Sequence, residues 1–88
     1  MKLERWQTFS KHDQLLHVGA AIMRASTFQN KNNENFLIAL REAQALMSLT
    51  LQDPKWQKSD ALLFFKEELE QFAEDKRKEN IKILYQAF

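Results

Sequence analysis

The residues best suited to bind a metal ion are Asp13 and His17, which lie four positions apart in a predicted helix. Residues at i and i+4 share one helix face, so this carboxylate and imidazole could form half of a metal site. The other histidine, His12, lies about 140° away from His17 around the helix, which prevents both imidazoles from binding one ion. We interpret Asp13 and His17 as a solvated polar face, and keep a small metal-binding or hydrolytic protein as the least favoured alternative.

Signatures of other chemistry are missing from the sequence. Di-iron bundles need Glu-x-x-His motifs on facing helices, and neither histidine has an acidic residue three positions before it. Ser10, His12 and Asp13 have the residue types of a nucleophilic triad, but helix neighbours one or two positions apart point in different directions. A single glycine, Gly19, cannot build a phosphate-binding loop, and no cysteine can supply a thiolate. The sequence therefore predicts no catalytic residue, no metal ligand and no cofactor.

A basic cluster near the carboxyl terminus is the best candidate for contact with an anion. It comprises Lys76, Arg77, Lys78 and Lys82. Nucleic-acid binding normally needs a clear cationic excess, whereas this chain has thirteen Lys and Arg against twelve Asp and Glu. Cations also gather at helix C-termini, where they complement the helix dipole. We interpret the cluster as a solvated helix end, with a nucleic-acid-associated regulatory or accessory role as the alternative.

The apolar run over residues 62–65 is the most informative feature of the sequence. Four consecutive bulky side chains surround a helix turn, yet a helix in a small bundle buries only one stripe. The stripe expected in the core is Leu62, Phe65, Leu69 and Phe72. Leu63 and Phe64 then need another cover, which is the carboxy-terminal segment, the turn around Trp56 or a second chain. Left exposed, these two side chains would mark an interaction site.

The helix that carries both histidines is predicted over residues 3–28. The phase of Phe9 with Leu16 and Met23 favours one continuous helix over the alternative, a helix that begins at Ser10 as its N-cap. The predicted core stripe is Trp6, Phe9, Leu16, Ala20 and Met23, widened by Leu15, Gly19 and Ile22.

Two further helices follow from start and stop signals. Clustered asparagines over residues 30–33 predict a turn, after which Asn32 or Asn33 caps a second and most buried helix. Its expected stripe is Phe36, Leu40, Ala43, Met47 and Leu51. Pro54 stops this helix, Asp53 caps a short turn that contains Trp56, and Ser59 caps the third helix.

The carboxy-terminal stripe does not continue the phase of the third helix. Ile81 lies nine residues after Phe72, which places it on the opposite side of a continuous helix. We favour a break near Asn80 and a short fourth helix, over one helix that presents two faces to two partners.

Composition places the chain among small helical domains. Eighty-eight residues suffice for one domain, 44% of them are apolar, and a single glycine and a single proline argue against an all-β fold. The amino terminus lacks the apolar region of a signal peptide, and the longest apolar run is far shorter than the ~20 residues that span a bilayer. We expect a cytoplasmic protein that does not enter a membrane.

Together these patterns predict an all-α fold with one domain over residues 1–88. The expected architecture is a small antiparallel up-down helical bundle with three long helices and a short C-terminal helix. The expected function is that of a non-enzymatic protein–protein interaction module or a homodimer, with Leu63 and Phe64 on the interaction surface. The expected partner is another protein or a second copy of the chain, rather than nucleic acid.

Overall fold

The long helices begin at capping side chains in the computed structural model, which describes residues 2–57 and 59–87. At each start a side-chain oxygen accepts a hydrogen bond from the backbone N–H three residues later, which satisfies one of the free N–H groups of the first turn. The caps and their helices are Ser10 for α2 (Lys11–Phe28), Asn32 for α3 (Asn33–Gln52) and Ser59 for α4 (Asp60–Ala73). The predicted caps of the second and third helices are confirmed.

Three short elements complete the fold. They are α1 (Leu3–Trp6) and two 3₁₀-helices, η1 (Pro54–Trp56) and η2 (Ile81–Ala87). Asp53 Oδ1 accepts from the backbone N–H of Lys55 at 3.0 Å and so caps η1, as the sequence predicts. Pro54 stands at the start of η1, where its missing N–H costs no hydrogen bond.

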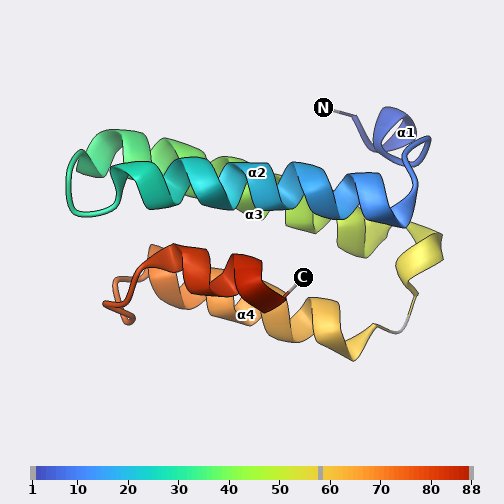
Figure 1. The fold of residues 1–88 in the computed structure, drawn as a ribbon. Helices are drawn as coiled ribbons and strands as arrows, with labels where there is room; N and C mark the ends of the chain where they lie inside the picture. The colour runs from blue at the N-terminus through green and yellow to red at the C-terminus, as the bar shows by residue number, and fades with distance from the viewer. Residues whose placement is uncertain (1, 58, 88) are drawn as a thin grey trace.

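The elements run up and down and close into a ring around the core (Figure 1). α2 and α3 are an antiparallel pair, α4 packs on α3, and η2 packs on α2 and on α4. α1 and η1 both contact α3 at the end of the bundle where that helix terminates. The arrangement confirms the predicted small all-α bundle of three long helices and a short C-terminal helix.

The core is built from one stripe on each helix. α3 has seven buried residues against six on α2 and four on α4, so the second predicted helix is the most buried. The stripe predicted for α4 is confirmed at all of its positions: Leu62, Phe65, Leu69 and Phe72. Ile81 and Leu84 of η2 are buried as well, and they fill the side of the core opposite α3. Of the helices that the structure describes, none is both long enough and apolar enough to cross a membrane.

The continuous first helix predicted over residues 3–28 is wrong. The chain leaves helical geometry after α1, and α2 starts afresh at its Ser10 cap. Of the predicted stripe, Trp6, Gly19 and Ile22 are buried, but the fresh start turns Ala20 outward together with Leu16 and Met23, which are 51% and 42% exposed. The buried face of α2 is formed instead by Gln14, Val18, Gly19, Ala21, Ile22 and Ala25.

The predicted break before the C-terminal helix is confirmed, but α4 ends at Ala73, earlier than Asn80. Asp75 has a φ of 59°, and its N–H bonds to the carbonyl of Phe72 while the N–H of Lys76 bonds to that of Gln71. These two bonds form a Schellman motif around a left-handed residue. Aspartate tolerates that conformation better than most residues, but without a glycine the sequence carries little sign of this end.

Candidate interaction surface

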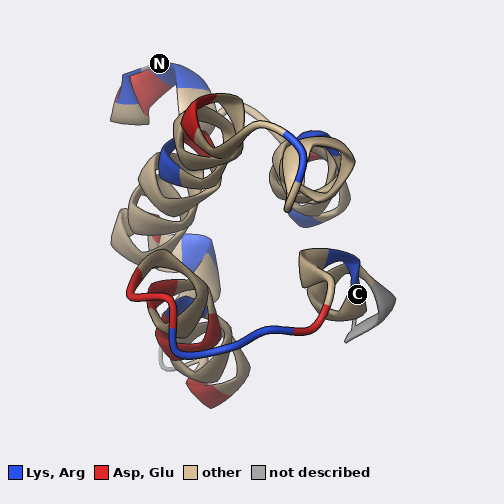
Figure 2. Ribbon diagram, turned by 90° about the vertical axis from the view of Figure 1, so that its left-hand side faces the viewer, with Lys and Arg blue, Asp and Glu red and all other residues tan. Residues whose placement is uncertain are grey.

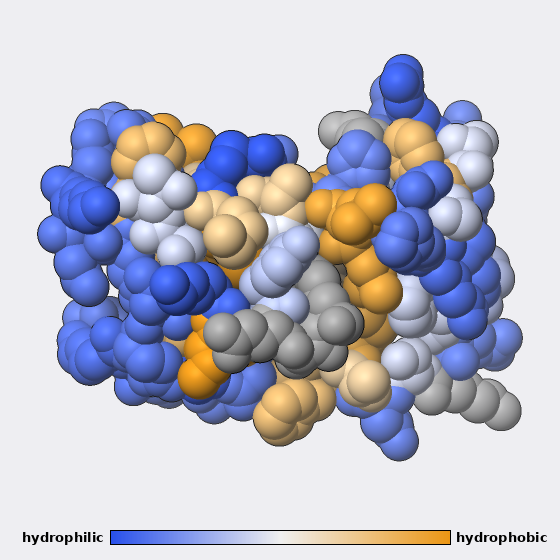
Figure 3. All heavy atoms as spheres, in the orientation of Figure 1, coloured by the Kyte–Doolittle hydropathy of each residue, from blue (hydrophilic) through white to orange (hydrophobic). Residues whose placement is uncertain are grey.

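An apolar groove lies where α2, η1, α4 and η2 meet, and its volume is ≈ 310 Å³. Its apolar walls are formed by Leu15, Trp56, Leu62, Phe64, Phe65 and Leu84. Figure 3 shows apolar side chains gathered on this face of the molecule, between α2 and α4. Residues as far apart in sequence as Leu15 and Leu84 thus contribute to one concave surface.

Leu63 and Phe64 are both exposed, and of the two only Phe64 lines this groove. Their exposed fractions are 51% and 64%, and Phe64 forms part of the groove wall. No described element of the chain covers them, because α4 already turns its full stripe from Leu62 to Phe72 into the core. Burying a side chain of this size contributes about 1.5–3 kcal/mol, so a partner that covers both would gain several kcal/mol.

Trp56 is held in the groove wall by a buried side chain of α2. Its indole Nε1 donates to Oε1 of Gln14 at 2.6 Å. On its other side, the ammonium of Lys11 lies 5.0 Å from the ring centroid, which is within the range of a cation–π contact. The indole therefore has a defined orientation, although its ring is only half-buried.

Gln14 also connects the groove to a buried polar network at the end of the bundle. Its Nε2 donates to the carbonyl of Trp6 at 2.8 Å and to Oδ2 of Asp53 at 2.9 Å. The indole of Trp6 donates in turn to Oγ1 of Thr50 at 3.1 Å. Gln14, Thr50 and Trp6 are all fully buried. The network ties α1 and η1 to α2 and α3, and it holds the residue that orients Trp56.

Asp53 and Lys55 complete the network with an ion pair. Lys55 Nζ donates to Oδ2 of Asp53 and to the carbonyls of Gln7 and Phe9, each at 2.9 Å. Burial by itself would raise the pKa of the Asp53 carboxyl, but hydrogen bonds from Gln14 and Lys55, together with the Lys55 charge, bring the pKa below its ordinary value. The Asp53 carboxylate is therefore charged and has hydrogen-bond partners, which is typical of a residue that stabilises the fold.

The polar side chains that line the groove are engaged as well. The hydroxyl of Ser59 accepts from the N–H of Leu62 at 3.3 Å, and the carboxylate of Glu68 pairs with Arg77. Acid–base catalysis needs a carboxyl group that can reach a substrate, and the carboxylate of Glu68 is engaged by Arg77 instead. The groove therefore offers apolar area rather than a reactive group.

The predicted basic cluster is interleaved with acidic residues. Lys76 pairs with Glu74 at 2.7 Å, Lys78 pairs with Asp75 at 2.9 Å, and Arg77 pairs with both Glu68 and Glu79. Figure 2 shows acidic, basic and again acidic residues in succession along the segment that joins α4 to η2. Lys82 lies apart from this segment, on η2, and is exposed. The arrangement balances charge within the cluster instead of presenting a cationic face.

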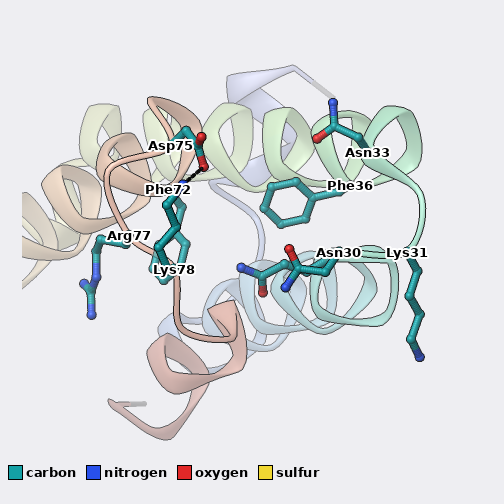
Figure 4. A pocket seen from close by; sticks show the side chains of 9 residues that line it. Asn30, Lys31, Asn33, Phe36, Phe72, Asp75, Arg77 and Lys78 are labelled. Atoms are coloured by element: carbon teal, nitrogen blue, oxygen red, sulfur yellow. Dashed lines mark hydrogen bonds and ion pairs between the residues drawn. The ribbon is translucent and has the colours of Figure 1, made fainter.

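A polar pocket lies beside this cluster, with a volume of ≈ 390 Å³. Figure 4 shows the side chains around it, which come from the turn between α2 and α3, the first turns of α3, the end of α4 and the segment that follows α4. Arg77 extends along the ring of Phe72, with its guanidinium carbon 4.9 Å from the ring centroid. Of the cations at this pocket, Arg77 and Lys78 are engaged by carboxylates, and Arg77 also by an aromatic ring.

The structure gives Asp13 and His17 different surroundings. The imidazole of His17 packs beside the rings of Phe9 and Trp6, at centroid distances of 5.0 and 5.7 Å. Asp13 is exposed in the first turn of α2, where its backbone N–H bonds to Ser10. Among residues 2–57 and 59–87, no group of three or more His, Cys, Asp or Glu side chains could hold a metal ion.

Comparison of the chain with known protein families, curated proteins and solved structures found no match. The assignment of function therefore depends on the surface itself. The sequence identified Leu63 and Phe64, but it did not identify Leu15 or Leu84 as groove walls. That role depends on how the helices are rotated in the bundle, which periodicity alone does not fix.

Proposed function

We propose that the protein is a non-enzymatic interaction module that binds another protein through the groove together with Leu63 and Phe64. The observation that carries this proposal is an apolar groove whose wall includes the exposed ring of Phe64, with Leu63 exposed at the adjacent position of α4. Contiguous exposed apolar area of this kind marks interaction sites on soluble proteins. The cytoplasm, which the sequence predicts, is the proposed location.

The other functions considered have less support. A role in nucleic-acid binding would need free cations, and Lys76, Arg77 and Lys78 are all paired with carboxylates. Enzymatic activity would need a polar group with an altered pKa in a cleft, whereas the groove is lined by apolar side chains and two engaged polar ones. Binding to another protein, in contrast, would use the exposed apolar side chains of this surface.

Site-specific photo-crosslinking tests this function in the native cell. A photoreactive phenylalanine analogue at position 64 is expected to form a covalent product with a bound protein. The matched control is the same analogue at Ile38 of α3, which is apolar and exposed but does not line the groove. A product of twice the chain's mass would identify a second copy as the bound protein. No product at position 64, or the same products at both positions, would contradict the proposal.

A further inference from the structure

The charges next to Leu63 and Phe64 are acidic. Asp60 precedes the two apolar residues by one helix turn and Glu67 follows them by one turn, and both side chains are exposed. Glu68 lines the groove itself, where Arg77 pairs with it. Between positions 60 and 75 the sequence has six carboxylates and a single cation, Lys66. Figure 2 shows acidic residues along α4.

The opposite side of the groove has a different charge. There the ammonium of Lys11 lies over the ring of Trp56. On α4 itself, Lys66 hydrogen-bonds to Glu70 at 2.8 Å and also interacts electrostatically with Glu67. Exposed carboxylates therefore lie on α4 beside Phe64 of the groove wall, and Lys11 of α2 lies over Trp56 of η1.

We propose that the occupant of the groove is an amphipathic helix of a partner protein, with its apolar face in the groove and a basic flank over α4. This inference rests on the proposed interaction function and adds the chemistry of the partner. An amphipathic helix laid into an apolar groove is a common mode of peptide recognition, and its anchors at i, i+3 or i+4, and i+7 suit a groove that follows a helix. Lysine or arginine beside those anchors meets Asp60 and Glu67, which increases the rate of association and selects the partner.

The same charges disfavour a second copy as the occupant. Two copies related by a two-fold axis perpendicular to α4 would bring α4 against α4 in antiparallel orientation. Leu63 and Phe64 would then cover each other, but Asp60 of one copy would lie opposite Glu67 of the other. Like charges placed together across an interface oppose binding, so this face selects a partner with the opposite charge.

Two synthetic helical peptides test the inference. Both have the length of α4, the same leucine stripe and no tryptophan, but one has lysine flanks and the other has glutamate flanks. Binding is followed through the fluorescence of Trp56 in the groove. The lysine peptide is expected to bind about tenfold more tightly at low salt, and the difference is expected to shrink as salt screens the exposed charges.

A matched pair of variants locates the effect on α4. Glu67→Gln is expected to weaken the lysine peptide by roughly twofold to fivefold, as the loss of one exposed ion pair does. Glu34→Gln, an exposed change in the first turn of α3, is expected to leave binding unchanged. Equal affinity for both peptides would overturn the basic partner while the interaction function stands. Binding of neither peptide would overturn both, and a dimer through Leu63 and Phe64 that the lysine peptide fails to dissociate would overturn the inference in favour of a second copy.

Discussion

The two tryptophans of this chain lie in opposite kinds of surroundings. Trp6 is fully buried, and its indole N–H and backbone carbonyl both have hydrogen-bond partners in the network of Gln14, Thr50 and Asp53. Trp56 is half-buried in a groove beside the exposed side chains of Leu63 and Phe64. In the region around Trp6, buried polar groups all have hydrogen-bond partners. In the groove around Trp56, apolar side chains are left exposed.

This contrast separates residues that stabilise the fold from residues that we propose bind a partner. Burying a polar group without a partner costs free energy, so a network in which every buried side-chain polar atom of the described residues is bonded serves folding. Exposed apolar side chains such as Phe64 contribute little to the stability of the isolated chain. Their free energy becomes available only when a partner covers them. Changes in the first region should therefore alter stability, and changes in the second should alter binding.

The largest effect is expected for Asp53→Ala. The change leaves Gln14 and Lys55 without their carboxylate and removes the cap of η1, so it should lower the free energy of unfolding by about 3 kcal/mol. Urea unfolding followed by circular dichroism measures the loss. Asp13→Ala, an exposed change at the start of α2, should cost no more than about 0.5 kcal/mol. Equal losses for the two variants would show that the network is not structural.

A loss of about 2 kcal/mol is expected for Thr50→Val. Valine keeps the shape of threonine but leaves the buried indole N–H of Trp6 without an acceptor. Thr27→Val is the matched control, because the hydroxyls of both threonines donate to the carbonyl four residues earlier, but Thr27 is exposed. Thermal unfolding compares the two. If Thr50→Val were as stable as Thr27→Val, the hydrogen bond between Trp6 and Thr50 would not contribute to stability.

Acid should weaken the network by a smaller amount. Because the pKa of Asp53 in the folded state is below its ordinary value of about 3.9, its carboxylate stabilises the fold at pH above about 4, and this contribution is lost as pH falls through the lowered pKa. Urea unfolding at a series of pH values should show this loss in the unaltered protein and a weaker one in Asp53→Asn. The pKa of Glu79 is also lowered, by a hydrogen bond to its own backbone and by Arg77, but that residue is exposed. Glu79→Gln should therefore keep the acid loss, and an unchanged profile in Asp53→Asn would contradict the assignment.

The smallest effect on stability is expected at the groove. Phe64→Ala should change the free energy of unfolding by no more than about 0.5 kcal/mol, because its ring is already exposed. Phe65→Ala, one residue further along α4, should cost about 3 kcal/mol, because it opens a cavity in the core. Chemical unfolding of both variants makes this comparison between adjacent phenylalanines. A large loss for Phe64→Ala would make that residue part of the fold and remove the main support for an interaction surface.

Local signals made much of the fold predictable. Asn32 and Ser59 predicted where their helices begin, because a capping side chain bonds to a backbone N–H only three residues later. The stripe of α4 was predictable because its apolar spacing extends over three turns in one phase. Leu63 and Phe64 stood out because they do not fit that stripe.

The phase of α2 was predicted wrongly, because the continuous helix was preferred to one that begins at Ser10. The core face of α2 includes Gln14, which is bonded to Trp6 and Asp53, 8 and 39 residues away. A polar residue that is buried by distant partners cannot be recognised from apolar periodicity, which assigned Leu16 to the core in its place. The groove was beyond prediction for the same reason, since Leu15 and Leu84 meet Phe64 only after the helices are oriented.

The two indole N–H groups provide the most direct test of this account. Trp6 reports on the buried network and Trp56 on the groove, and Trp56→Phe assigns their two signals in a ¹H–¹⁵N spectrum. Titration with the lysine-flanked peptide should shift the Trp56 indole signal and leave that of Trp6 in place. Binding that shifts the Trp6 signal, or that leaves the Trp56 signal unmoved, would contradict the claim that this groove is where the protein meets its partner.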